Sequence, residues 1–447
     1  MLKKILDLLK NNYWIKSGSI TVVNRLLVSF LGLLSFIILI RILNKDDYGI
    51  WVLFITITSL IEASRNALIS IPLVAKIAGT ASSKNSLFVK ETNASLQLNI
   101  SSFFIIAIIL YFTSSVISKI WDAERLNNLI YIYIITSFFL SLLIHFNVIQ
   151  QAAYRFTGIL ISNLSRKLSF LLLIILLFIF EMNVSLISLV YIDLFSVLFS
   201  TIITFFITRK YLIIKFKILF ENVYKHFVIG IFSFGTNISS MIFKSMDKWM
   251  LGALLSPVAV ALYDPAIRIA NLFEVPLSGI SNIYFPKLAE EIKAKGKHVT
   301  KYFFEKSVGV LMAVITPFII IAIFLSEIII YLIAGDGFTE SSAVLKITLL
   351  YGLIIPFYRQ YGITLMALKE TKLNFYTTIF TVVLNIVFNY IFINEFGVIG
   401  AAYGTLSAYL LSLILLIIIL YKKLEIELSN ILKYSLNFYS DIFKRIL

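Results

Sequence analysis

The sequence predicts an all-α integral membrane protein, and three observations support that prediction. Of the 447 residues 60% are hydrophobic and only 14% are charged, and the mean hydropathy is +0.94. Soluble domains carry about a quarter charged residues, so lipid is expected to be the main solvent of this chain. Apolar stretches of about 20 residues, long enough to cross a bilayer, recur from Ile20 to Leu420. No Pro/Gly/Ser-rich linker separates them, so the embedded part is expected to form one body.

Twelve such stretches are predicted as transmembrane helices. They cover approximately residues 18–41, 49–74, 93–118, 127–150, 157–180, 184–208, 227–251, 257–284, 302–332, 341–367, 371–394 and 397–421. The connections near Glu181 and Glu395 are so short that the helices flanking each one are predicted to form antiparallel hairpins. Residues 1–17 are basic and amphipathic, and we expect them to lie on the cytoplasmic surface rather than to act as a removed signal peptide.

The distribution of basic residues predicts the orientation. The net charge is +15, but Lys and Arg lie between apolar runs, as juxtamembrane anchors do, so nucleic acid is not an expected partner. With the N-terminus inside, the inner segments hold most of the Lys and Arg and the outer loops hold few. The positive-inside rule therefore predicts that both termini are cytoplasmic. The chain has no cysteine, which excludes disulfides, thiolate nucleophiles and cysteine metal sites.

An internal repeat is indicated by matches that share one offset. Pro72 falls on Pro286, Thr157 falls on Thr371, and Asn183 falls on Gly397. An offset that spans six helices preserves topology, so two parallel repeats are expected. The predicted domains are an N-lobe (18–210), a cytoplasmic linker (211–226), a C-lobe (227–421) and an amphipathic cytoplasmic tail (422–447). The two pseudo-symmetric six-helix lobes are expected to enclose a central cavity near mid-membrane.

Polar residues inside the predicted spans indicate where a pathway could run, because buried charges in membranes usually face a bundle interior or a cavity. The candidates share a position on the polar face of an apolar helix: Arg25, Glu62, Arg65, Asp193, Asn237, Lys244, Asp264, Arg268 and Asn271. Glu62 and Arg65 are three residues apart and are expected to neutralise one another. Pro265 is expected to bend its helix.

Two further groups are given structural interpretations. Asp247 and Lys248 lie at the outer end of their span and are expected to form an interfacial ion pair. A stripe from Asn374 to Asn389, which includes Asn385, is expected to serve helix packing, because small and polar side chains are favoured where membrane helices touch.

Three segments resemble a known family. They are Arg41 to Trp51 (RILNKDDYGIW), the stretch beginning at Asp247 (DKWMLGALLSP) and continuing to Pro286, and Gly397 to Ala402 (GVIGAA). They resemble the O-antigen and polysaccharide flippases of the multidrug/oligosaccharidyl-lipid/polysaccharide (MOP) superfamily, and the resemblance covers essentially the whole chain. It implies twelve helices in two bundles. It also implies export of undecaprenyl-diphosphate-linked oligosaccharide repeat units from the inner to the outer leaflet of the bacterial cytoplasmic membrane, by alternating access, for O-antigen, capsule or exopolysaccharide assembly.

The expected substrate explains the arginines. A lipid diphosphate carries about two negative charges, and a guanidinium can hold phosphate oxygens in a bidentate manner. Arg25, Arg65, Lys244 and Arg268 are therefore predicted to bind the diphosphate in the cavity. The resemblance supports Arg25, which lies where related lipid II flippases carry a helix-1 arginine, whereas Arg65 does not match their helix-2 position closely. Expected partners are the lipid-linked oligosaccharide, membrane lipids and the polysaccharide polymerase or chain-length machinery.

Two alternatives remain open. A MATE-like cation-coupled antiporter for small molecules would rely on acidic N-lobe residues, and Asp193 appears unpaired in the sequence, which makes it the candidate for ion coupling. A membrane glycosyltransferase or polymerase acting on the same lipid carrier would need paired carboxylates facing water, and no such outer pair exists beyond Asp46 and Asp47. Nucleotide, zinc-hydrolase and nucleophile-elbow motifs are absent, so no catalytic residue, metal or cofactor is predicted.

Overall fold

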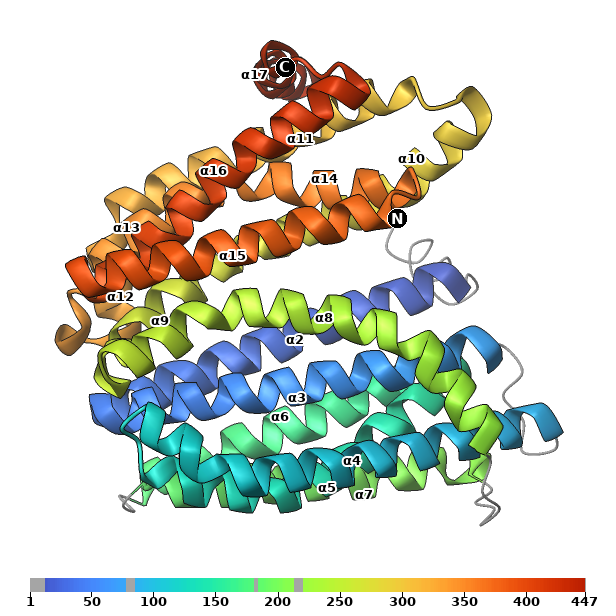
Figure 1. Ribbon diagram of the computed structural model, residues 1–447, viewed down its shortest axis with the longest axis vertical. Helices are drawn as coiled ribbons and strands as arrows, with labels where there is room; N and C mark the ends of the chain where they lie inside the picture. Colours follow the sequence, from blue (N-terminus) through green and yellow to red (C-terminus); the bar gives the residue numbers. More distant parts are fainter. Residues whose placement is uncertain (1–12, 78–84, 181–183, 213–219, 447) are drawn as a thin grey trace. The chain divides into compact units, whose positions relative to one another are not determined.

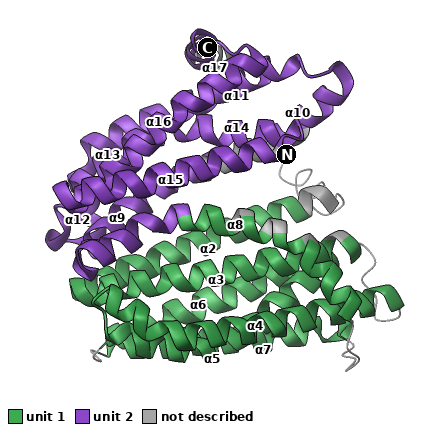
Figure 2. Cartoon of the chain, in the orientation of Figure 1, with its two compact units in different colours: residues 1–242 green, residues 243–447 purple. Residues whose placement is uncertain are grey.

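The computed structural model describes residues 13–77, 85–180, 184–212 and 220–446, and in those ranges the chain is α-helical apart from short turns. It divides into two compact units, Met1–Ile242 and Phe243–Leu447 (Figure 2). Residues 1–12, most of the predicted N-terminal surface segment, lie outside the described ranges. The predicted all-α membrane fold is confirmed, and all twelve predicted spans fall on helices.

The first unit contains six long helices and the start of a seventh. They are α2 (Tyr13–Ile42), α3 (Lys45–Ile77), α4 (Ser86–Ile120), α5 (Arg125–Ala152), α6 (Phe156–Ile179), α7 (Leu186–Thr208) and the first part of α8 (Phe220–Leu254). Helix α5 packs against α3, α4, α6 and α7 (Figure 1). The connection near Glu181 joins α6 to α7, which pack side by side as the predicted hairpin.

Helix ends in this unit are fixed by polar side chains, which satisfy backbone N–H groups that have no partner within the helix. The side chain of Asn85 accepts hydrogen bonds from the amides of Leu87 and Phe88 at the start of α4. Ser185 forms a capping box with Ser188 at the start of α7. These caps let each helix begin sharply after a short connection.

The start of α8 is held to the first unit by a buried carboxylate. Glu91 on α4 accepts hydrogen bonds from Lys76 on α3 (3.0 Å) and from Asn222 on α8 (2.8 Å), and the His226 ring lies 2.7 Å from it. Gly230 lies directly against the α3 backbone, since a Cβ there would lie 2.6 Å from the Leu68 carbonyl oxygen. These contacts attach residues of the predicted cytoplasmic linker to the first unit.

The second unit contains the rest of α8 and nine further helices. They are α9 (Pro257–Leu272), α10 (Glu274–Lys295), α11 (Val299–Phe324), α12 (Ser326–Ala334), α13 (Ser341–Gly352), α14 (Ile355–Ala367), α15 (Thr371–Phe396), α16 (Val398–Leu424) and α17 (Leu428–Ile446). Three predicted spans, 257–284, 302–332 and 341–367, are each broken into two helices. The α13–α14 pair is bent by 41°, and Pro356 opens α14, where its missing backbone N–H costs no helical bond.

Pro265, where a bend is predicted, lies inside α9, and the break into a second helix comes at Phe273, between α9 and α10. The helix continues past the proline, and the neighbouring residues Asp264 and Ala266 are each 0% exposed. The bend itself stays a prediction.

Helices α15 and α16 form the predicted hairpin near Glu395. Gly397 between them has φ +63°, a conformation that favours glycine. Gly400 and Gly404 then allow the two backbones to approach closely. A Cβ at Gly400 would lie 1.9 Å from the Phe392 carbonyl oxygen, and one at Gly404 would lie 2.2 Å from Asn389 Oδ1. The small residues of the GVIGAA segment therefore serve tight helix packing.

Within the predicted tail, α17 forms an amphipathic helix that packs on α11. Glu305 on α11 accepts hydrogen bonds from the backbone N–H of Glu427 (2.7 Å) and from the Asn430 side chain (3.1 Å). Gly309 lies against the α17 backbone, because a Cβ there would lie 2.6 Å from the Ile431 carbonyl oxygen.

The exposed surfaces of the helices are those of a membrane protein. Among the described residues, nine helices are long and apolar enough to cross a membrane, or ten if the bent pair α13 and α14 is one span. On α4 a run of large apolar side chains is 54 to 71% exposed, a pattern suited to lipid rather than water: Phe104, Ile105, Ile108, Ile109 and Phe112.

Candidate functional site

An ion network of three helices lies inside the first unit. Arg166 on α6 donates two hydrogen bonds to the Glu62 carboxylate on α3, at 2.9 and 3.0 Å. Its Nη2 also lies 3.6 Å from Asp193 Oδ1 on α7. The three side chains are 18%, 28% and 17% exposed, respectively. The prediction that Asp193 is unpaired is therefore wrong, because it shares Arg166 with Glu62.

Arg65 has a different environment from the predicted one. Its guanidinium is buried and donates hydrogen bonds to the Ser137 carbonyl oxygen (2.9 Å) and hydroxyl (3.0 Å) on α5. Arg65 interacts electrostatically with Glu62, as predicted, but the hydrogen-bonded partner of Glu62 is Arg166. Arg65 joins α3 to α5, and its side chain is buried, so a diphosphate has no access to it in this structure.

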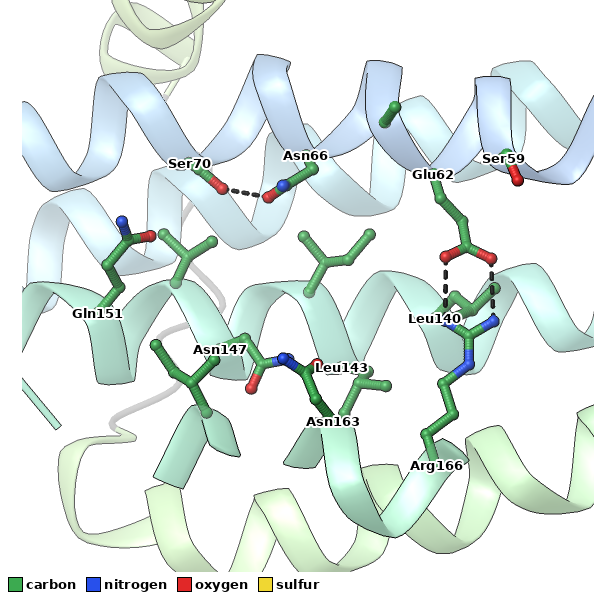
Figure 3. Close-up of a pocket in the computed structure, with 14 residues that line it drawn as sticks. Ser59, Glu62, Asn66, Ser70, Leu140, Leu143, Asn147, Gln151, Asn163 and Arg166 are labelled. Atoms are coloured by element: carbon green, nitrogen blue, oxygen red, sulfur yellow. Dashed lines mark hydrogen bonds and ion pairs between the residues drawn. The ribbon is translucent and has the colours of Figure 1, made fainter. Parts of the chain in front are cut away.

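A polar pocket of about 450 Å³ lies beside this network, between α3, α5 and α6 (Figure 3). The Glu62–Arg166 pair lies toward one end of it and Ser70 with Gln151 toward the other, with Asn66, Asn147 and Asn163 between them. The other lining residues are Ser59, Ala63, Leu140, Leu143, Ile144, Val148 and Ile159. Of these residues, sequence analysis identified only Glu62 as a candidate site residue.

Helical spacing in the sequence could have identified several pocket-lining residues that were not predicted. Ile159, Asn163 and Arg166 follow the i, i+4, i+7 spacing of one helix face, the same criterion that selected Asp264, Arg268 and Asn271. Asn147 and Gln151 are four residues apart on α5 and also share a face. Helical phase therefore places these groups on common faces, but it does not show that the α5 and α6 faces meet Glu62.

In the second unit a buried carboxylate pairs with two cations. Asp264 on α9 is 0% exposed and accepts from Lys248 on α8 and from Arg268 on α9, each at 2.5 Å. Sequence analysis placed Asp264 and Arg268 on one stripe, and the structure brings them together. The predicted ion pair of Asp247 with Lys248 is wrong, since Lys248 pairs with Asp264.

Asp247 instead lies in a network of neutral groups. It is 8% exposed and accepts from Tyr263 (2.6 Å), Asn389 (2.7 Å) and Thr405 (2.9 and 3.0 Å), with Asn385 at 3.3 Å. The side-chain oxygens of Asn385 and Asn389 are buried and have no hydrogen-bond partner among the described residues. An intramembrane carboxylate bound by neutral hydrogen-bond donors is a candidate for uptake of a proton or a small cation. The Asn374–Asn389 stripe on α15, which was interpreted as packing, thus supplies part of a polar site.

The remaining predicted residues lie apart within their own units. Arg25 on α2 is exposed, and no described residue forms an ion pair with it. Lys244 on α8 is exposed and donates to Glu274 on α10 at 3.1 and 3.3 Å. Asn271 is exposed at the end of α9. The side chain of Asn237 lies outside the part of the chain that the structure describes.

Comparison with known proteins places these features in context. A family model described as "Polysaccharide biosynthesis protein" matches residues 38–343. Over 196 residues the chain is 24% identical to a protein of Haloferax volcanii described as a probable low-salt glycan biosynthesis flippase, Agl15. That alignment covers 44% of this chain and 42% of the relative, so it spans less than half of the relative's length.

Solved structures show the same fold at low identity. The lipid II flippase MurJ in an inward closed conformation matches with TM-score 0.75 and 18% identity, covering 93% of this chain and 89% of that one. An inward-facing multidrug resistance MATE family transporter of the MOP superfamily matches with TM-score 0.75 and 16% identity, covering 90% and 98%. The predicted MOP fold is thereby confirmed. These relatives are flippases and transporters, which supports the prediction that the chain is not an enzyme.

Proposed function

This chain belongs to the polysaccharide biosynthesis protein family, and from that premise we propose that it is a flippase for undecaprenyl-diphosphate-linked oligosaccharide repeat units. It moves them from the inner to the outer leaflet by alternating access, and the glycan serves O-antigen, capsule or exopolysaccharide assembly. The match of the family model to residues 38–343 carries this proposal. The fold shared with a lipid II flippase supports it.

The diphosphate is held by exposed cations in this proposal. Arg25 is the strongest candidate, since it is exposed and no described residue forms an ion pair with it, and a guanidinium inside an apolar helix needs water or an anion. Arg268, 33% exposed, and Lys244, 57% exposed, are further candidates that also contact carboxylates. Arg65 is not among these candidates because it is buried between α3 and α5.

The membrane setting follows from the charge distribution. We place the chain in the bacterial cytoplasmic membrane with both termini inside, as the excess of Lys and Arg in the inner segments favours. Its partners are the lipid-linked oligosaccharide, membrane lipids and the polymerase or chain-length machinery that receives the flipped unit.

Ion coupling is assigned to Asp247 rather than to Asp193. Asp193 shares Arg166 with Glu62. Asp247 instead accepts hydrogen bonds from neutral groups, the hydroxyls of Tyr263 and Thr405 and the amides of Asn385 and Asn389. Cation coupling at Asp247 would also suit the alternative function, a MATE-like antiporter for small molecules. The substrate test separates the two functions.

A reconstituted transport assay tests the proposal. The lipid-linked oligosaccharide pool extracted from the producing cells is placed in proteoliposomes, and its appearance in the opposite leaflet is measured with an added lectin. We expect transport by the native protein and a loss of about tenfold or more in Arg25→Ala, the worth of a charge-assisted hydrogen bond to phosphate. Lys293→Ala, which changes an exposed cation on α10, is the matched control. Absence of transport by the native protein, with drug export intact, would support the antiporter instead.

A further inference from the structure

The amide-rich pocket of the first unit is not explained by diphosphate binding. Its lining brings three asparagines, one glutamine and two serines into a volume of about 450 Å³, within the range of about 300–1,000 Å³ that is typical of small-molecule sites. Such a concentration of amides in a membrane helix bundle is costly unless the groups find partners.

The charges beside the pocket are paired with one another. Arg166 is the cation among the pocket-lining residues, and its two terminal nitrogens bond both oxygens of Glu62. Asp193 approaches the same guanidinium at 3.6 Å, and Arg65 and Lys167 also interact electrostatically with Glu62. Because these charges already have partners, the amides are the groups left to recognise a ligand, and we expect that ligand to be uncharged.

The amide side chains that line the pocket can both donate and accept hydrogen bonds. Asn147 carries such an amide midway along the pocket (Figure 3). A ligand that both donates and accepts can pair with this lining, whereas an apolar ligand would leave buried polar groups without a partner, at about 1–3 kcal/mol for each group. The amides of Asn66, Asn163 and Gln151 also present both kinds of group.

Apolar side chains complete the walls. Leu140, Leu143, Ile144, Val148 and Ile159 share the lining with the amides. A sugar ring has the matching chemistry, since its hydroxyl and acetamido groups donate and accept hydrogen bonds while its C–H faces pack on aliphatic side chains.

We propose that this pocket is the subsite for the glycan of the lipid-linked substrate, where it binds uncharged sugar residues through hydroxyl and acetamido groups. This inference rests on the proposed flippase function. Ser70 and Gln151 lie near the ends of α3 and α5, which are cytoplasmic in the proposed orientation. The glycan enters from that side, where repeat units are assembled, and the Glu62–Arg166 pair forms the far end of the pocket (Figure 3).

Two lipid probes test the subsite with full-length protein in nanodiscs. One probe is undecaprenyl diphosphate, and the other is the lipid-linked oligosaccharide pool extracted from the producing cells. We expect the native protein to bind the pool at least tenfold more tightly than undecaprenyl diphosphate. Asn147→Leu and, separately, Asn163→Leu should each reduce that preference about tenfold, with no change in affinity for undecaprenyl diphosphate. Asn394→Leu, which changes an exposed amide on α15, should keep the preference.

The outcomes separate this proposal from the one on which it rests. A native protein that binds neither lipid contradicts the flippase function. Equal binding of both lipids by the native protein, or a preference retained in both pocket variants, overturns the glycan subsite alone. The two variants change residues on different helices. Binding of undecaprenyl diphosphate reports that each variant is folded, since a misfolded variant would lose affinity for both undecaprenyl diphosphate and the oligosaccharide pool.

Discussion

Removal of the Arg166 guanidinium should destabilise the first unit through the two carboxylates that it leaves behind. Arg166→Gln removes two hydrogen bonds of 2.9 and 3.0 Å to Glu62 and the 3.6 Å contact with Asp193. Breaking a fully buried pair costs about 3–5 kcal/mol, and an exposed pair is worth about 0–1 kcal/mol. The Arg166 and Glu62 side chains are 18% and 28% exposed, so water screens part of the interaction, and we expect a loss of about 2–3 kcal/mol.

A double-mutant cycle isolates the pairwise contribution. Glu62→Gln, Arg166→Gln and the double variant are compared by thermal unfolding in detergent, monitored by size-exclusion of the surviving protein. At about 2–4 °C per kcal/mol, Arg166→Gln should lower the midpoint by roughly 5 °C. Unfolding of membrane proteins is often irreversible, so all variants are heated at one rate.

The double variant carries the decisive result. Removing Glu62 as well leaves only Asp193 near the former guanidinium position, so the double variant should be more stable than Arg166→Gln, with a coupling energy of about 1–2 kcal/mol. A coupling energy below about 0.5 kcal/mol would refute the assignment of Arg166 as the partner of Glu62. It would also remove the argument that the charges beside the adjacent pocket are paired with one another.

Two other predictions concern the second unit. Gly404→Ala should lower the stability of this unit by about 1–3 kcal/mol, because a Cβ would lie 2.2 Å from Asn389 Oδ1 and 2.8 Å from Asn389 N. The control is Gly32→Ala, which has nothing within 4 Å of the new Cβ and should be neutral or slightly stabilising by helix propensity. Equal thermal midpoints for the two variants would contradict the close approach at Gly404. The second prediction is that Asp247 binds a cation. Replacing choline chloride with sodium chloride at equal ionic strength should then raise the unfolding midpoint of the native protein but not that of Asp247→Asn. The same shift in both proteins would exclude this site.

The positions of the helices were predictable because membrane length and hydrophobicity are local properties of the sequence. All twelve predicted spans fall on helices, and the hairpin after Phe396 followed from its short connection. Breaks within spans were missed because hydropathy is insensitive to a bend. The 41° bend between α13 and α14 occurs where the sequence around the break is apolar. Pro356 marks its position, because a proline at the start of a helix loses no helical hydrogen bond.

The partners of the charged residues were harder to predict, and the reason is geometric. Glu62 has a cation three residues away in Arg65, yet it binds Arg166, 104 residues away, because Arg65 faces Ser137. Asp247 and Lys248 are neighbours in sequence, but adjacent helical residues point about 100° apart, so they reach different partners. Helical phase predicts the face on which a charge lies, whereas its partner depends on which helix packs there. A charge pair within one membrane helix is therefore a weaker prediction than a polar face, and each buried ion should be matched first with polar faces on the other helices.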